Sequence, residues 1–205
     1  MAPKYKLTYF NMPGRAEPIR FIFAYAGQDY EDFRINLDQW AEIKPSTPFG
    51  QVPVLEVDGK LVGESRAICR YLAKQFNLLG ENDWEALQAD MFVDALESCK
   101  QVIMRTMKET DPDKIKEIKQ QAANFLKKFD EAIASNPAGL LVGSKVTWAD
   151  LYFAASLPNT IERHPDIAKP FSALTSLIKQ INNLPSIKEW LEKRPKSDFV
   201  PPPRN

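Results

Sequence analysis

One short segment combines a tight turn, a helix start and a serine hydroxyl, and this combination favours the binding of a small anion. Within residues 52–62, an apolar run containing Pro53 is followed by an Asp-Gly pair and a second apolar run, which predicts a β-hairpin. We expect a cis bond before Pro53, because a proline cannot donate to a strand ladder and must lie at an edge or bend. The helical spacing that begins at Ser65 places a hydroxyl and unpaired N–H groups where a carboxylate would bind.

A tyrosine stands near the end of the first predicted strand. Residues 5–10 alternate in polarity, so Tyr9 shares a strand face with Tyr5 and Leu7. A turn that contains Gly14 follows at once, so the phenol could reach a cleft. A core role is the commoner one for a tyrosine at the end of a strand, and the pattern by itself leaves both interpretations open.

The histidine and cysteine content narrows the chemistry. His164 is the single histidine, and it would have to serve alone in any Ser-His-Asp or Cys-His mechanism, so we interpret it as a surface residue. Cys69 and Cys99 form no C-x-x-C pair, which is typical of a reduced cytoplasmic protein and not of a disulfide scaffold, a zinc finger or a dithiol redox enzyme. We interpret both cysteines as buried helical residues.

The overall composition excludes further classes of function. The 205 residues contain 27 Lys plus Arg and 27 Asp plus Glu, so the formal net charge is zero. Because no basic block stands out, we expect neither nucleic acid nor an anionic membrane as the main partner. No apolar run reaches the roughly 18 residues that a membrane helix needs, and the chain begins without a signal-like segment. We therefore expect a cytoplasmic protein with no membrane segment.

The pattern of the chain changes near residue 80. Residues 1–79 alternate strand and helix signals in the order β-α-β, loop, β-β-α, with residues 36–50 expected to be the loop. Residues 83–205 show only helical spacing, most clearly at residues 115–133. The predicted fold class is therefore an α/β domain over 1–79 followed by an all-helical domain over 83–205.

Capping signals mark several of the expected helix starts. Thr147 and Asp150 form a predicted capping box, as do Asn82 and Glu85, and we interpret Asp150 as structural. Pro185 fits the first position of a last helix.

Taken together and in order, these motifs resemble the cytosolic glutathione transferases, and the sigma class in particular. Each motif by itself is weak evidence for this family, but the set of motifs is specific and covers nearly the whole chain. The matching segments are YKLTYF at 5–10, GRAE at 14–17, Trp40, PFGQVPVL at 48–55, Glu64-Ser65 with AICRYL at 67–72, VTWAD at 146–150 and KRP at 193–195.

The resemblance implies a thioredoxin-like first domain, a helical second domain and glutathione as the co-substrate, with no metal expected. Carried over by position, Tyr9 would hold the glutathione sulfur, and Arg15 would sit beside Tyr9 and help polarise it. Asp94 and Glu97 would face the glutathione of a neighbouring subunit or a divalent ion, but Ser98 replaces the third acid of some relatives and disfavours the metal. The other implied glutathione contacts are Trp40, Lys44, Gln51, the backbone of Val52 before Pro53, Glu64 and Ser65.

Two of these positions depart from the pattern of the sigma class. Glu64 stands where Gln is more frequent, and Gln51 stands where relatives often have Lys. The Glu64 carboxylate could pair with the γ-glutamyl ammonium, yet it adds negative charge beside an anionic ligand. Compared with the sigma pattern, the implied site therefore has one more carboxylate and one fewer cation.

The resemblance also implies an apolar electrophile pocket lined by residues of both domains. Residues 100–105 contain no aromatic side chain, whereas vertebrate prostaglandin D synthase has one in that helix, so prostaglandin isomerisation is disfavoured. The implied pocket residues are Phe10, Met12, Gly14, Met104 and Arg105.

The function implied is that of a homodimeric detoxification enzyme, which conjugates glutathione to apolar electrophiles and could also reduce organic hydroperoxides. The alternatives are a glutathione-dependent isomerase of the prostaglandin D synthase type, and a non-catalytic carrier or structural protein on the same fold.

Overall fold

The structure is a computed structural model that describes residues 3–162 and 164–197. The chain divides into two compact units. The first contains the residues up to Leu72 and those from Ser186 onward, and the second runs from Ala73 to Pro185. The last helix thus groups with the first unit. The boundaries 1–79 and 83–205 rest on the sequence pattern and stay a prediction.

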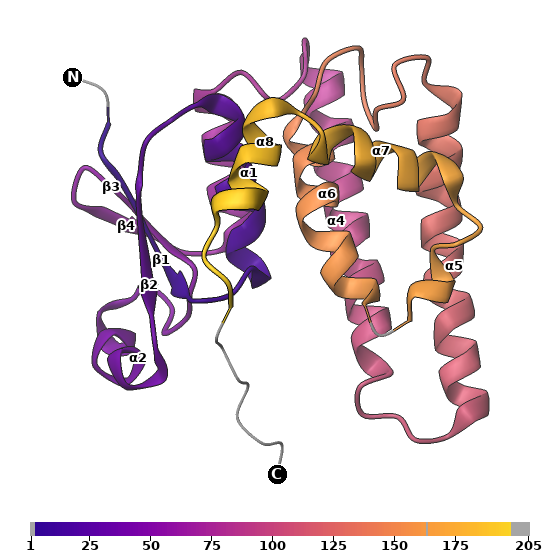
Figure 1. The fold of residues 1–205 in the computed structure, drawn as a ribbon, viewed down its shortest axis with the longest axis horizontal. Coiled ribbons are helices and arrows are strands. Elements are labelled where there is room, and N and C mark those ends of the chain that lie inside the picture. The colour runs from indigo at the N-terminus through magenta and orange to yellow at the C-terminus, as the bar shows by residue number, and fades with distance from the viewer. Residues whose placement is uncertain (1–2, 163, 198–205) are drawn as a thin grey trace. The chain divides into compact units, whose positions relative to one another are not determined.

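The first unit contains a mixed four-stranded sheet (Figure 1). Its strands are β1 (Tyr5–Phe10), β2 (Glu31–Ile35), β3 (Val54–Val57) and β4 (Lys60–Val62), in the order β2-β1-β3-β4. β1 pairs in parallel with β2 and antiparallel with β3, and β3 and β4 form the predicted hairpin. Along β1, Tyr5, Leu7 and Tyr9 are all buried, so the predicted inward face is confirmed. The bond between Val52 and Pro53 is cis, as expected.

The helices of the first unit follow the predicted order with one exception. They are η1 (Gly14–Ala16), α1 (Glu17–Ala26), α2 (Leu37–Ile43), η2 (Lys44–Ser46), α3 (Ser65–Gln75), whose last turn enters the second unit, and α8 (Pro185–Lys193). Pro18 lies in the first turn of α1, and Gly27 ends that helix with φ of 63°. α8 lies beside α1 (Figure 1).

The expectation of a plain loop at residues 36–50 was wrong, because a capping box starts α2 there. The side chain of Asn36 accepts the N–H of Gln39 at 2.8 Å, and the side chain of Gln39 accepts the N–H of Asn36 at 2.9 Å. The two exchanged bonds satisfy N–H groups that a helix start leaves without partners. They fix the start of a helix that is only seven residues long.

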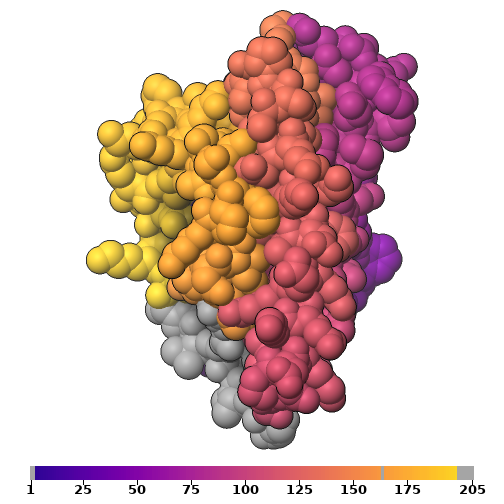
Figure 2. All heavy atoms as spheres, turned by 90° about the vertical axis from the view of Figure 1, so that its right-hand side faces the viewer, coloured from indigo at the N-terminus to yellow at the C-terminus, as the bar shows by residue number. Residues whose placement is uncertain are grey.

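The part of the second unit that the structure describes consists of helices and connecting loops. The helices are α4 (Asp83–Arg105), α5 (Pro112–Ser135), α6 (Trp148–Ile161), η3 (Pro165–Ile167) and α7 (Ser172–Asn182). α5 and α7 lie side by side on the face that Figure 2 shows. The buried stripe of α5 includes Ile118, Ala122, Phe129 and Ile133, as its spacing predicts. The predicted α/β plus all-α fold class is confirmed.

The start of α4 differs in one detail from the predicted capping box. The side chain of Asn82 accepts the N–H of Glu85 at 3.0 Å, as expected. The carboxylate of Glu85 accepts the N–H of Glu81 at 2.7 Å, so it bonds one residue before the cap. Pro185 opens α8, and its place as the first residue of that helix is confirmed.

The carboxylate of Asp150 is fully buried and joins two parts of the second unit. One of its oxygens accepts the N–H of Leu141 at 2.9 Å. The other accepts the N–H of Thr147 at 2.8 Å and the Thr147 hydroxyl at 2.9 Å. Burial raises the pKa of the Asp150 carboxyl, and these donors oppose the rise by favouring the ionised form. The capping box and the structural interpretation of Asp150 are thus borne out by the geometry.

The single histidine lies beside the hydroxyl of Thr106. His164 Nε2 is 3.1 Å from Thr106 Oγ1. The Thr106 hydroxyl donates its own proton to the carbonyl of Ile103 at 2.7 Å, so it accepts a hydrogen bond from the ring. His164 is partly exposed, which is compatible with its interpretation as a surface residue.

Both cysteines are completely buried, and we expect neither to react with a thiol reagent in the folded protein. Burial raises the pKa of the Cys99 thiol to about 12, so this group stays protonated at pH 8. Titration with a disulfide reagent at pH 8 should count no thiol before denaturation and both afterwards. Stoichiometric labelling of the folded protein would contradict this expectation.

Within the described residues, no helix is both long and apolar enough to cross a membrane.

Candidate active site

Six of the residues predicted from the sequence line one pocket of the first unit. The pocket encloses about 260 Å³, part of which is open to solvent. Phe49 and Gly63 also line it, and the sequence did not mark them. The lining residues are Arg15, Phe49, Gln51, Val52, Pro53, Gly63, Glu64 and Ser65.

One wall of this pocket is the start of α3. The carbonyl of Glu64 accepts the N–H of Ile68 at 2.9 Å, so Glu64 is the capping residue and Ser65 is the first helical residue. The helix thus begins at Ser65, as the helical spacing in the sequence predicts. The first N–H groups of a helix lack partners within the helix and carry its partial positive charge, so this wall favours an anion. Ser65 is 8% exposed, while the Glu64 side chain reaches solvent.

The backbone of Glu64 adopts a conformation that is unusual for a residue with a side chain. Its φ is 66°, in the left-handed region. Non-glycine residues in this region cost roughly 1 kcal/mol or more and occur often at ligand-binding sites. This torsion holds the Glu64 side chain and the first N–H groups of α3 at the same pocket.

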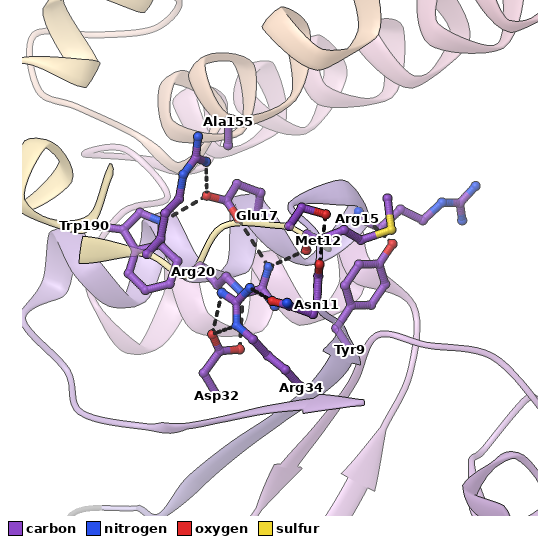
Figure 3. Close-up of polar contacts among 12 residues, drawn as sticks. Tyr9, Asn11, Met12, Arg15, Glu17, Arg20, Asp32, Arg34, Ala155 and Trp190 are labelled. Atoms are coloured by element: carbon purple, nitrogen blue, oxygen red, sulfur yellow. Dashed lines mark hydrogen bonds and ion pairs between the residues drawn. The ribbon is translucent and has the colours of Figure 1, made fainter. Parts of the chain in front are cut away.

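Tyr9 lies at the end of β1 with its ring buried and its hydroxyl facing the loop that follows (Figure 3). The hydroxyl oxygen accepts the backbone N–H of Arg15 at 3.1 Å. This bond uses an oxygen lone pair and leaves the phenol proton to donate to another acceptor. The sequence predicted that Arg15 lies beside Tyr9, and the structure makes that contact through the main chain, with the Arg15 side chain exposed.

Aromatic rings extend from Tyr9 toward α2. The Phe10 ring lies 5.9 Å from the Tyr9 ring and 5.9 Å from the Trp40 ring, edge to face in both cases. Such pairs contribute about 0.5–1.5 kcal/mol beyond the area that they bury. Trp40 is half-buried on α2, and Lys44 is exposed one turn later. Trp40 and Lys44, both predicted to contact glutathione, thus lie in the segment 36–50 that was expected to be a loop.

Gly14 leaves room for the Tyr9 hydroxyl. A Cβ atom at position 14 would lie 2.5 Å from Tyr9 Oη, and the Gly14 φ is 45°. Gly14→Ala should therefore displace the phenol and lower kcat/KM at least about tenfold, beyond a backbone cost of roughly 1–2 kcal/mol. Steady-state kinetics and denaturant unfolding measure the two effects separately.

Gly27→Ala is the matched control for Gly14→Ala. Gly27 has a φ of 63°, but a Cβ at that position would meet nothing within 4 Å. We expect Gly27→Ala to lose a similar amount of stability and to keep its kcat/KM. Equal activity losses in the two variants would show that backbone strain, and not contact with Tyr9, causes the effect of Gly14→Ala.

The remaining predicted residues lie on α4, in the second unit. Glu97 Oε1 already accepts from Lys100 Nζ at 2.6 Å and from the Tyr152 hydroxyl at 2.8 Å. Arg105 donates to the side chain of Gln121 at 3.0 Å. Met104 is exposed, and Asp94 lies one turn before Glu97. Within residues 3–162 and 164–197, no cluster of three His, Cys, Asp or Glu side chains could hold a metal ion.

A buried polar network beside Tyr9 was missed from the sequence (Figure 3). Glu17 and Arg20 of α1 are almost fully buried and lie 3.3 Å apart. Asp32 of β2 pairs with Arg20 at 3.2 Å and with Arg34 at 2.8 Å. In the sequence, Glu17 was marked only as part of the matching GRAE segment, and Arg20 was not marked at all. Every residue of α1 from Glu17 to Phe23 is buried, so this part of the helix has no solvent-exposed face on which a surface pair could lie.

The sequence matches two domain models of one known protein family. Residues 5–74 match the family model described as "Glutathione S-transferase, N-terminal domain", and residues 93–194 match "Glutathione S-transferase, C-terminal domain". The chain is 41% identical over 199 residues to glutathione S-transferase S1 of Drosophila melanogaster, covering 93% of this chain and 79% of the relative. It is 39% identical over 201 residues to hematopoietic prostaglandin D synthase of Gallus gallus, covering 95% of this chain and 98% of the relative. Among solved structures, the glutathione S-transferase of Ascaris lumbricoides matches with a TM-score of 0.89 at 36% identity, covering 96% of this chain and all of that one.

Proposed function

Because the chain belongs to the glutathione S-transferase family, we propose that it is a sigma-class enzyme that transfers the glutathione thiolate to apolar electrophiles. The prediction that it is an enzyme of this family, with a thioredoxin-like first domain and a helical second domain, is confirmed. The position of Tyr9 carries the proposal, because its phenol proton is left to donate and because Arg15, whose N–H bonds the phenol oxygen, lines the pocket.

The pocket at the start of α3 supports binding of the γ-glutamyl end of glutathione. Its carboxylate would meet the first N–H groups of α3 and the Ser65 hydroxyl. Its ammonium would meet the exposed carboxylate of Glu64. The backbone of Val52, before the cis bond, would pair with the cysteinyl part of the peptide.

The opposite end of glutathione carries the glycyl carboxylate. We propose that Trp40, Lys44 and Gln51 surround it, as the resemblance implies. Lys44 is an exposed cation, and Gln51 lines the same pocket as Ser65. The pocket thus offers a donor or a cation for each carboxylate of the peptide.

Ionising the glutathione thiol is the chemical task of the site. A free thiol with a pKa of about 8.5 is only about 3% ionised at pH 7. A hydrogen bond donated by Tyr9 stabilises the thiolate without accepting its proton. The Arg15 N–H, which bonds the Tyr9 oxygen at 3.1 Å, polarises the phenol and strengthens that donation.

The thiolate would then attack an apolar electrophile or the oxygen of an organic hydroperoxide. The electrophile would contact Phe10, Met12 and Gly14 of the first unit. The contributions of Met104 and Arg105 stay a prediction. The apolar and sulfur-containing side chains of this set suit substrates of varied shape.

Glutathione-dependent isomerisation is a second candidate, favoured by the relative named hematopoietic prostaglandin D synthase. It needs the same thiolate, so Tyr9 would keep its role. The absence of an aromatic side chain from residues 100–105 counts against it. Assays with a prostaglandin endoperoxide and with a chloronitrobenzene, on one preparation, would separate the two activities.

Retention on immobilised glutathione, combined with turnover of a chloronitrobenzene, tests the proposed transferase. We expect the protein to be retained and to form the thioether. Retention without turnover of any electrophile would instead support a carrier protein on this fold. No retention would contradict the proposed glutathione site.

We further propose that the enzyme is a homodimer. On α4, Trp84, Leu87 and Met91 are 67%, 56% and 53% exposed and lie three and four residues apart, on one face of the helix. Covering this apolar face with a second copy would remove it from water.

Analytical ultracentrifugation of the wild type should then give twice the 23.3 kDa mass of one chain. Leu87→Glu places a charge on this face and should give the mass of a single chain, whereas Lys116→Glu, an exposed charge change on α5, should not. A monomeric wild type at micromolar concentration would contradict the dimer.

A further inference from the structure

The last described residues of the chain are tied to α1 by two hydrogen bonds that end on one oxygen atom (Figure 3). Trp190 Nε1 donates to Glu17 Oε1 at 2.9 Å, and Arg194 Nη1 donates to the same oxygen at 2.7 Å. Glu17 is only 1% exposed, whereas the Arg194 side chain is 34% exposed. A buried carboxylate is costly unless it is paired, so these two donors hold α8 and the residues after it against α1.

The same segment is tied a second time, to the loop that follows Tyr9. The Ser197 hydroxyl donates to the carbonyl of Asn11 at 2.9 Å. The side chain of Asn11 in turn donates to the carbonyl of Lys196 at 3.3 Å. We call residues 190–197, which make these contacts, the C-terminal strap.

The loop is held from its other side by the buried arginines. Arg20 Nη1 donates to the carbonyl of Met12 at 2.7 Å, and Arg34 Nη1 donates to the Asn11 side chain at 2.9 Å. Asp32 bridges the two guanidinium groups. Asn11 and Met12 are thus fixed between the C-terminal strap and the charged residues of α1 and β2.

This loop leads directly to the groups that aim the phenol. Met12 is followed by Gly14, which leaves room for Tyr9 Oη, and by Arg15, whose N–H bonds that oxygen. Glu17 begins α1 two residues after Arg15. A shift of the loop would therefore move the Arg15 N–H relative to the Tyr9 hydroxyl.

We infer that the C-terminal strap is a positioning element for Tyr9, with Arg194 as its principal residue and Glu17 of α1 as the acceptor that holds it. The inference rests on the proposed function, because it concerns the geometry in which Tyr9 donates to the glutathione thiolate. The hydrogen bonds of the strap described above end on Glu17 and Asn11, and neither residue lines the glutathione pocket in the first unit. Loosening it should therefore impair thiol ionisation more than glutathione binding.

Arg194→Gln tests the inference, with two matched variants on the same helix end. Lys193→Gln removes the same charge one residue earlier, from an exposed pair with Glu189. Arg194→Lys keeps a cation that can still pair with Glu17. For each variant we would titrate the bound glutathione thiol by its ultraviolet absorbance, and measure kcat and the KM for glutathione across pH.

In Arg194→Gln we expect the pKa of the bound thiol to rise by about half a unit to one unit, which lowers kcat/KM about three- to tenfold below that pKa. The loss should disappear at high pH, where the thiol ionises unaided, and the KM for glutathione should change less than about twofold. Arg194→Lys should recover most of the shift, and Lys193→Gln should match the wild type. A merely structural role would lower stability and leave the pH profile in place.

An unchanged thiol pKa in Arg194→Gln, with a wild-type KM for glutathione, would overturn the inference about the strap and leave the proposed function in place. If Arg194→Gln does not fold, Trp190→Phe keeps the aromatic ring and removes the N–H donor, and an unchanged thiol pKa in that variant would overturn the inference equally. A wild type whose bound thiol ionises no more readily than free glutathione would overturn the proposed function, and the inference with it.

Discussion

Tyr9→Phe is expected to lower kcat/KM at pH 7 about 25-fold while glutathione still binds. If the phenol lowers the thiol pKa by about two units, roughly 2.7 kcal/mol, the bound thiol is about three-quarters ionised at pH 7. Without the phenol the ionised fraction returns to about 3%. The ring stays in place because it is buried in the sheet core, so the loss comes from the hydroxyl. Steady-state kinetics with a chloronitrobenzene measures it.

Tyr30→Phe is the matched control for this substitution. Burial raises the pKa of the Tyr30 hydroxyl, which stays protonated, and within the described residues this hydroxyl makes no hydrogen bond. Its ring stacks on Phe23 at 4.3 Å and would keep that contact as Phe. We expect wild-type activity from Tyr30→Phe. A Tyr9→Phe enzyme that retains more than about half of the wild-type rate at pH 7 would remove Tyr9 from the mechanism.

Asp150→Ala is expected to destabilise the protein by at least about 3 kcal/mol, the largest stability loss that we predict. The substitution leaves three buried donors without their acceptor, namely the Leu141 N–H, the Thr147 N–H and the Thr147 hydroxyl. Each buried group that loses its partner costs about 1–3 kcal/mol. The start of α6 also loses its capping box. Denaturant unfolding followed by circular dichroism measures the loss.

Asp150→Asn should fall between the wild type and Asp150→Ala. An amide has one acceptor oxygen where the carboxylate has two, so its NH₂ group would face a donor. Asp166→Ala is the control, because its pair with Lys119 is largely exposed and surface pairs contribute about 1 kcal/mol or less. Equal losses in Asp150→Ala and Asp166→Ala would contradict the structural role of Asp150.

The elements with strong local signals could be predicted from the sequence. The Asp-Gly turn between two apolar runs marked the hairpin, Pro185 marked the start of α8, and the Thr147–Asp150 spacing marked the start of α6. These features depend on residues close together in the chain, and for this reason the pattern contains them.

The features that the sequence did not reveal depend on short elements or on distant contacts. α2 is too short to show a clear helical period, and the segment that contains its capping box at Asn36 was therefore interpreted as a loop. No sequence pattern indicated that Glu17 is buried, because its hydrogen-bond donors Trp190 and Arg194 lie more than 170 positions later. The pocket residues were predicted individually through the resemblance, and only the fold shows that Arg15 and Ser65 line the same pocket.

The ionisation of glutathione bound to the wild-type enzyme tests the central proposal most directly. The thiolate absorbs in the ultraviolet, so a pH titration of the saturated complex against free glutathione gives the pKa of the bound thiol. We expect a pKa at least about one unit below that of the free thiol, equivalent to roughly 1.4 kcal/mol of thiolate stabilisation. A saturated complex with no thiolate below pH 8 would contradict the proposal that Tyr9 activates glutathione.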